Sequence, residues 1–176
     1  MQSFVRAVDA LNEQLGRATA WLLWIMAILS VLVVVLRYAA GIGAIALQET
    51  ILYLHATVFM VGAAYTLRHN AHVRVDIFYQ RFSPRVRSLV EIGGALLFLL
   101  PVTVFIFWSS LDYVAASWRI HEVSPDGGLP YVYVLKTLLL VMPVLLALQG
   151  LAEIVRHGLF LAGRHPELHE RELGEL

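Results

Sequence analysis

The residues best placed to do chemistry in this sequence are a few polar side chains inside or beside long apolar runs. Glu49 lies about one turn inside such a run and His55 lies deeper in it, while Gln149 and Glu153 are four apart and share a helix face. A carboxylate within a bilayer is costly, so it is usually paired, turned toward protein or functional. Two readings of Glu49 stay open: a hydrogen bond to a neighbour such as Arg37, or contact with a partner subunit or a proton relay.

His55 raises the possibility of a haem ligand. A haem in a four-helix bundle usually takes two facing axial ligands. The other six histidines lie at the ends of the apolar runs or in the connections: His69, His72, His121, His157, His165 and His169. We therefore expect His55 to hydrogen-bond across helices, and a haem-bearing or redox-complex membrane anchor remains an alternative.

The sequence lacks the motifs of common enzymes. It has no nucleophile elbow, HExxH pair, P-loop or dinucleotide fingerprint. With no cysteine, it has no thiolate nucleophile and no cysteine metal site. His69 and His72 are the closest histidine pair, which is a weak metal signal. We predict that the chain is not an enzyme and that it holds no metal and no cofactor.

The composition predicts an all-α integral membrane protein. Hydrophobic residues make up 59% of the chain and charged residues 15%, where a soluble domain has about a quarter; the mean hydropathy is +0.72. We expect one four-helix membrane domain over residues 1–162, with four transmembrane helices at about 18–38, 44–67, 86–118 and 130–161, and a polar cytoplasmic tail over 163–176.

The lengths of the apolar runs refine this picture. A helix needs about 20 residues to cross about 30 Å of hydrocarbon, so the long third and fourth helices are expected to tilt or project. The uncharged run Ala18–Leu36 exceeds the apolar core of about 7–15 residues in a secretory signal. The leader Met1–Arg17 has the pattern of a short N-terminal amphipathic helix on the membrane surface.

The basic residues predict the orientation, because short connections rich in Lys and Arg stay in the cytoplasm. Ten of the thirteen fall in the leader, the second connection and the tail, which places both termini and that connection inside: Arg6, Arg17, Arg68, Arg74, Arg81, Arg85, Arg87, Arg156, Arg164 and Arg171. The loop WRIHEVSPDGGLPY then faces outward.

Two connecting segments carry further patterns. In HVRVD, residues 72–76, polar and apolar residues alternate, which indicates an ordered extended or interfacial segment. SPDGGLP is a turn signal, because Pro125 fixes φ, Asp126 and two glycines permit tight turns, and Pro130 can begin a helix. The turn either only connects two helices or presents a rigid outward surface to another protein.

The ordered set of motifs resembles the small, DctQ-type membrane subunit of tripartite ATP-independent periplasmic (TRAP) transporters. The matching pieces are QETILYLHATVFMVGAAYTLRHNAHVRVDIFY at 48–79, EVSPDGGLP at 122–130 and KTLLLVMPVLLALQGLAEI at 136–154. They cover helices two to four in order. Helix one matches only in being apolar.

This resemblance implies a small scaffold subunit of a secondary, sodium-coupled importer of organic acids in the bacterial inner membrane. Its partners would be a large multi-span membrane subunit, which carries the sodium and substrate sites, a periplasmic substrate-binding protein and lipids, but no nucleic acid. The form of the outer loop is most similar to the branch that handles keto acids, mannitol or chloroaromatic acids.

The resemblance also suggests roles for single residues. We expect partner-subunit contacts from Glu49, His72, Arg74, Asp76 and Gln149. Docking of the binding protein is assigned to Glu122, Ser124 and Asp126, and lipid headgroup contacts to Arg81, Arg85 and Arg87. Arg74 and Asp76 would make charged contacts with the large subunit or lock their segment to Arg85 and Arg87. A small homo-oligomeric exporter or channel, with Glu49 facing a shared pore, is the main alternative.

Overall fold

Four helical segments make up the computed structural model, which describes residues 1–71 and 82–163. They are α1 (Gln2–Ala39), α2 (Ile45–Arg68), a third segment built of α4 (Pro84–Gly94), a π-helical turn (Ala95–Leu99) and α5 (Leu100–Arg119), and α6 (Val132–Leu161). All four are long and apolar enough to cross a membrane. No strand occurs in these ranges, so the prediction of an all-α membrane protein with four spans is confirmed.

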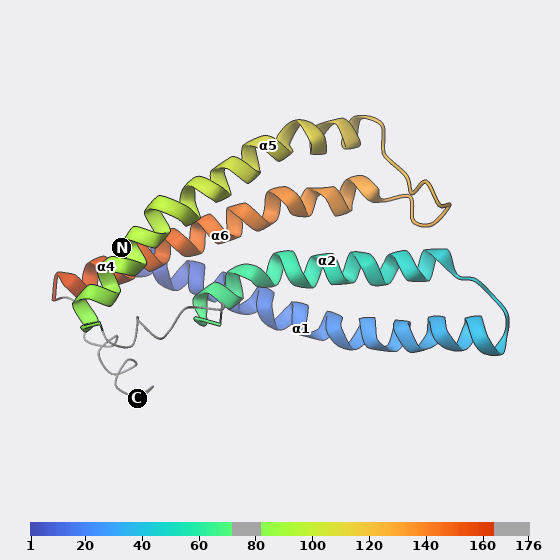
Figure 1. Cartoon of the computed structure of the whole chain (residues 1–176), viewed down its shortest axis with the longest axis horizontal. Coiled ribbons are helices and arrows are strands. Elements are labelled where there is room, and N and C mark those ends of the chain that lie inside the picture. Colours follow the sequence, from blue (N-terminus) through green and yellow to red (C-terminus); the bar gives the residue numbers. More distant parts are fainter. Residues whose placement is uncertain (72–81, 164–176) are drawn as a thin grey trace.

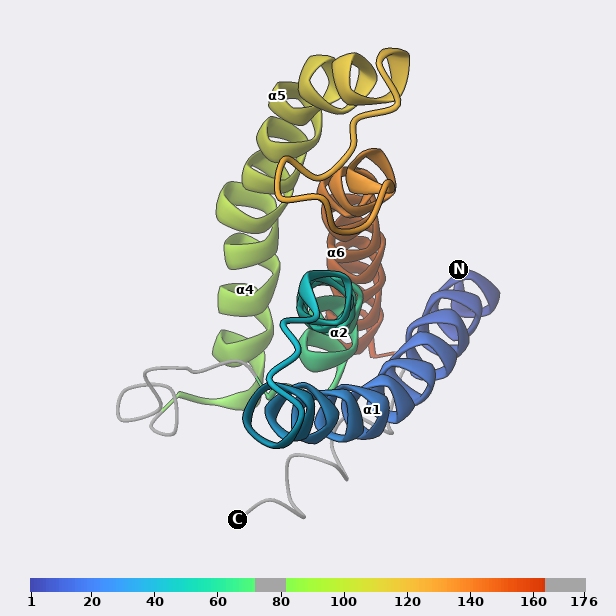
Figure 2. The same ribbon diagram turned by 90° about the vertical axis from the view of Figure 1, so that its right-hand side faces the viewer.

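Helix α6 is the centre of the bundle. It contacts α1, α2, α4 and α5, whereas the main contacts of α1 are with α2 and α6. Figures 1 and 2 show α1 and α2 as an antiparallel pair on one side of α6, with α4 and α5 on the other. The N-terminus, the end of α2, the start of α4 and the end of α6 share one end of the bundle, here named the terminal end; the connections 40–44 and 120–131 lie at the other, the loop end.

The leader differs from the sequence prediction in one respect. It is helical, as expected, but it is continuous with the first span in one helix of 38 residues. Val5 and Val8 are buried against Ala152 of α6, whereas Phe4 and Leu11 are exposed, so the apolar residues of the leader are divided between a protein contact and the surface. No proline interrupts the chain between leader and span, and Gly16 is fully helical there, so nothing local ends the helix.

The third helical segment contains a single π-helical turn before Pro101. Proline has no N–H and its ring crowds the preceding turn, which disturbs the regular α-helical hydrogen bonds. Gly150 of α6 is buried at this level, where a Cβ atom would lie 2.6 Å from Cδ2 of Leu99. The absence of a side chain at Gly150 therefore lets α6 approach the widened turn closely.

The core is small and the outward faces are strongly apolar. Val61 and Ala64 of α2 pack with Leu145 of α6. By contrast, large side chains on α1 and α5 lie on the surface, among them Trp21, Trp24, Phe105 and Trp108. Such faces need hydrocarbon or another membrane protein against them.

Gly16 provides a test of the contact between α1 and α2. A Cβ atom at Gly16 would collide with the Tyr65 ring of α2, whereas one at Gly158 would meet nothing within 4 Å. Both glycines are helical, so alanine gains about 1 kcal/mol of helix propensity at either position. We expect Gly16→Ala to lose stability overall, since overpacking costs about 1–3 kcal/mol, and Gly158→Ala to be neutral or stabilising. Thermal unfolding in mild detergent measures both, and equal melting temperatures would contradict the close packing of Tyr65 on Gly16.

Candidate functional site

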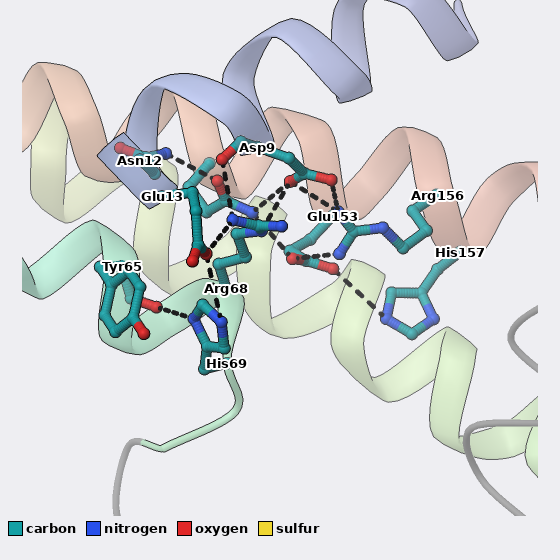
Figure 3. Close-up of polar contacts among 10 residues, drawn as sticks. Asp9, Asn12, Glu13, Tyr65, Arg68, His69, Glu153, Arg156 and His157 are labelled. Atoms are coloured by element: carbon teal, nitrogen blue, oxygen red, sulfur yellow. Dashed lines mark hydrogen bonds and ion pairs between the residues drawn. The ribbon is translucent and has the colours of Figure 1, made fainter. Parts of the chain in front are cut away.

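A cluster of polar side chains joins three helices at the terminal end. Asp9, Asn12 and Glu13 come from α1 and Arg68 from α2, and they meet the α6 residues Gln149, Glu153 and Arg156 (Figure 3). We name these seven residues the terminal-end network. The four-residue helical repeat brings it about, since Asp9 and Glu13 share a face of α1, as Gln149 and Glu153 do on α6.

Arg156 is the central cation of the network. Its Nη2 donates to both carboxylate oxygens of Asp9 at 2.7 Å, and its Nη1 donates to Glu153. Only 14% of the Arg156 side chain and 19% of the Asp9 side chain are exposed. Hydrogen bonds between ionised groups are roughly twice as strong as neutral ones, so this pair ties the leader part of α1 firmly to α6.

Gln149 and Asn12 form the buried floor of the network. Gln149 is fully buried and Asn12 is 1% exposed. The Gln149 oxygen accepts from Asn12 Nδ2 at 2.7 Å, and its nitrogen donates to Glu153 at 3.0 Å and to Asp9 at 3.3 Å. Because a buried amide without partners is destabilising, these bonds explain why Gln149 is tolerated here. The structure thus gives Gln149 an intrachain role, and its contact with a partner subunit stays a prediction.

Arg68 connects the end of α2 to the same cluster. Its Nη1 donates to the backbone oxygen of Asp9 at 2.9 Å and to Glu13 Oε2 at 2.6 Å, and Glu13 also accepts from the exposed Arg17 at 3.0 Å. A cation in the last turn also complements the helix dipole. Within the network three carboxylates face two arginines, Arg68 and Arg156, and the exposed Arg17 adds a third positive charge at its edge.

A second polar cluster lies at the loop end and centres on Glu49 of α2. Its carboxylate accepts hydrogen bonds from the Ser124 hydroxyl and, at 2.6 Å, from the backbone N–H of Leu129. Both donors belong to the connection between α5 and α6, and a Cβ atom at Gly128 would collide with the carboxylate. Of the two readings of Glu49, the structure supports a hydrogen-bonded neighbour, but this neighbour is the loop of residues 120–131 between α5 and α6, here named the outer loop, and not Arg37.

Glu122 forms the other fixed point of this loop. It accepts hydrogen bonds from Lys136 Nζ of α6 and, at 2.6 Å, from the Ser117 hydroxyl of α5. The hydrogen bond from Lys136, followed by that from Ser117, lowers the pKa of Glu122 below its ordinary value. The Lys136 ammonium also lies 4.0 Å from the centre of the Tyr113 ring. Glu122 thus joins the ends of α5 and α6.

The remaining predicted residues are distributed as follows. Asp126 lies on the exposed side of the outer loop, whereas Ser124 is buried. Arg85 is exposed, and Arg87 Nε donates to the Phe82 oxygen at 3.1 Å. Four expected contact residues lie outside the described ranges: His72, Arg74, Asp76 and Arg81.

The expectation for His55 is wrong. It is exposed and stacks on Phe59, with ring centres 6.5 Å apart, and the described residues offer it no hydrogen bond across helices. The physical reason is its position on α2. It lies nine residues before the fully buried Ala64, which at 3.6 residues per turn places it on the opposite face of the helix. Within residues 1–71 and 82–163, no group of three or more His, Asp and Glu side chains could hold a metal ion.

Asp9, Asn12, Arg68 and Arg156 were not singled out from the sequence as site residues. A signal was present, because Asp9, Asn12 and Glu13 form a polar stripe on the leader and Gln149, Glu153 and Arg156 form one on α6. Each stripe follows the i, i+3, i+4 or i, i+4, i+7 spacing of a single helix face. Pairing the two stripes required knowing that the leader packs against α6.

The order of four long helices, with a polar cluster at each of the two ends, can now be compared with known families. Residues 26–158 match the family described as tripartite ATP-independent periplasmic transporters, DctQ component. The chain belongs to this family. It is therefore a transporter component and not an enzyme, and a multi-pass protein of the inner membrane. No curated protein and no solved structure matched the chain.

The family match covers only part of the terminal-end network. It includes Arg68 and the three α6 residues, but it begins at residue 26, after Asp9, Asn12 and Glu13. Glu49 and the whole outer loop lie inside it. The loop-end cluster thus falls within the part of the chain that the family shares, whereas the leader side of the terminal-end network lies before it.

Asp9→Asn tests the terminal-end network. The substitution keeps the size of the side chain but removes its negative charge. In the wild type, Nη2 of Arg156 lies 2.7 Å from both carboxylate oxygens of Asp9. Hydrogen bonds to charged groups contribute about 1.5–3 kcal/mol, and we expect a loss of this size in the free energy of unfolding. Arg17→Ala is the control, since its side chain is 78% exposed and such pairs contribute at most about 0.5 kcal/mol. Similar melting temperatures for the two variants in detergent would show that the network does not stabilise the bundle.

The lowered pKa of Glu122 predicts how the loop end responds to acid. A carboxyl whose pKa is lower in the folded protein stabilises it above the ordinary value of 4.5, and this contribution is lost as the pH falls through the lowered pKa. We expect Glu122→Gln to lower the melting temperature at neutral pH and the difference from the wild type to shrink below about pH 4. Melting curves over this range test it, and a difference that stays constant with pH would contradict the assignment.

Proposed function

We propose that this DctQ component is the scaffold subunit of a secondary, sodium-coupled importer of organic acids. In this role it braces the large membrane subunit and helps to dock the periplasmic substrate-binding protein. One observation carries the proposal: the polar residues at both ends of the bundle bind one another, while the apolar side chains along α1 and α5 face outward. Such a body is fixed internally and offers its sides to a membrane partner.

The internal contacts support the bracing role. A brace must keep its shape when its partner moves, and the terminal-end network holds α1, α2 and α6 together while Glu49 and Glu122 hold α2, α5 and α6 at the loop end. The third and fourth helical segments, of 36 and 30 residues, exceed the roughly 20 that a simple span needs. Long helices can lie at a slant along a partner. Sodium and the organic acid are assigned to the large subunit and the binding protein.

The orientation follows from charge. The terminal end carries Arg6, Arg17, Arg68 and Arg156, and positive residues favour the cytoplasm. We therefore place both termini in the cytoplasm and the loop end in the periplasm. A soluble periplasmic protein can then reach the outer loop, where Asp126 is exposed.

Co-purification with transport tests this function. The tagged chain is expressed with its neighbouring genes and extracted in mild detergent. We expect a large multi-span protein in one-to-one ratio, and sodium-dependent uptake of an organic acid into proteoliposomes only when both subunits and the soluble binding protein are present. Purification as a homo-oligomer that moves solute without other proteins would overturn the proposal and favour an exporter or channel.

A further inference from the structure

The outer loop is held by a residue from outside its own two helices. The loop joins α5 to α6, yet Glu49 reaches it from α2, 75 residues from Ser124 and 80 residues from Leu129. One carboxylate oxygen accepts from the Ser124 hydroxyl and the other from the Leu129 N–H. Both ends of the segment 124–129 are therefore attached to a single side chain.

The segment also closes on itself above that carboxylate. The Ser124 N–H donates to the Leu129 oxygen at 3.3 Å, and the Ser124 hydroxyl accepts from the Asp126 N–H at 3.2 Å. Gly127 has a φ of 72°, which favours glycine. Gly128 lies so close to Glu49 that a Cβ atom would collide with the carboxylate. The Glu49 carboxylate thus fixes the buried side of the loop, while Pro125, Asp126 and Gly127 are exposed on its other side.

A simple connection does not require this arrangement. Proline and two glycines already favour the turn, and a carboxylate near the end of a span has a desolvation cost. A charged acceptor with two donors lowers the conformational freedom of the loop, and a surface that is ordered beforehand loses less entropy when a partner binds it. The chemistry therefore fits a loop that must be presented in one shape.

We propose that Glu49 is a positioning residue for docking of the soluble binding protein, acting from α2 by fixing residues 124–129 of the outer loop. Glu49 itself contacts the loop and not the docked protein. This inference rests on the docking role of the loop in the proposed function. Contact of Glu49 with the large membrane subunit stays a separate prediction.

A spin label on the loop measures the positioning directly. The chain contains no cysteine, so Asp126→Cys gives it a single labelling site in the assembled transporter. We expect Glu49→Ala to raise the mobility of the nitroxide markedly. Glu49→Gln should leave it close to that of the parent, because the amide oxygen can accept from Leu129 and the amide nitrogen can donate to Ser124. Gly43→Ala, in the other connection at the loop end with nothing within 4 Å of its added Cβ, is the matched control.

Uptake measured against the concentration of the binding protein tests the consequence. We expect Glu49→Ala to raise the half-saturating concentration about tenfold, which corresponds to about 1.4 kcal/mol of docking free energy, while the maximal rate is retained. Glu49→Gln and Gly43→Ala should leave both quantities unchanged. A role in general stability alone would instead lower the amount of assembled transporter and the maximal rate together.

Gly128→Ala provides an independent route to the same result. The added methyl group pushes against the Glu49 carboxylate, so we expect a shift similar to that of Glu49→Ala. In a Glu49→Ala background the methyl group has room, and the second substitution should add little. Such non-additivity is the signature of two residues that act through one contact. Full additivity of the two effects would overturn the inference, and this cycle remains available if one single variant assembles poorly.

Two outcomes separate this inference from the proposed function. Asp126→Arg alters the exposed surface without removing a donor to Glu49, so it reports docking alone. If it raises the half-saturating concentration while Glu49→Ala does not, the loop docks the binding protein but Glu49 does not position it. If neither variant has an effect, the docking role of the loop fails as well. A nitroxide that stays immobile in Glu49→Ala also overturns the inference.

Discussion

In hydrocarbon a polar group has no water to replace a lost hydrogen bond, and this constraint accounts for the organisation of the whole chain. The two clusters in which polar side chains bind one another lie at the two ends of the bundle, while hydroxyls along the helices, such as those of Thr57 and Thr103, donate to the backbone of their own helix. Gln149 follows the constraint, since it is fully buried and both its oxygen and its nitrogen are used. Among the described residues, Asn12 Oδ1 and the Tyr53 hydroxyl are buried side-chain atoms without a hydrogen bond. Between the two ends the bundle is held by apolar and small side chains.

The sequence was informative where a single helix determines the answer. Length and hydropathy predicted the second span at 44–67 and the structure has α2 at Ile45–Arg68. The apolar pattern of the leader likewise predicted a helix. It could not predict what that helix packs against, because an amphipathic face suits a lipid surface and the face of α6 equally. The tertiary contact with Ala152 shows that Val5 and Val8 pack on α6, while Phe4 and Leu11 are exposed.

For the candidate sites, the sequence likewise indicated which residues need a partner but not which residues those partners are. The cost of a carboxylate at Glu49 marked the residue as needing a partner, but the partner is separated from it by 75 and 80 residues and by two helices. Gln149 and Glu153 were recognised as sharing a face of α6, while Arg156, which completes that face, and its partner Asp9 on α1 were missed. The prediction for His55 was wrong, because a polar residue inside a span suggested a hydrogen bond to another helix. His55 lies on the face of α2 opposite Ala64, where the described part of the chain offers it no such partner.

The two polar clusters have different structural effects. In the terminal-end network each carboxylate pairs with an arginine of the same chain, so its effect is to make α1, α2 and α6 one unit. At the loop end the Glu49 carboxylate is likewise hydrogen-bonded, but the segment that it holds is exposed at Pro125, Asp126 and Gly127. A satisfied polar group can therefore act at a distance, because the rigidity that it gives to one surface is available to whatever binds that surface. In the proposed scaffold role, shape maintained in this way is the property on which a partner would depend.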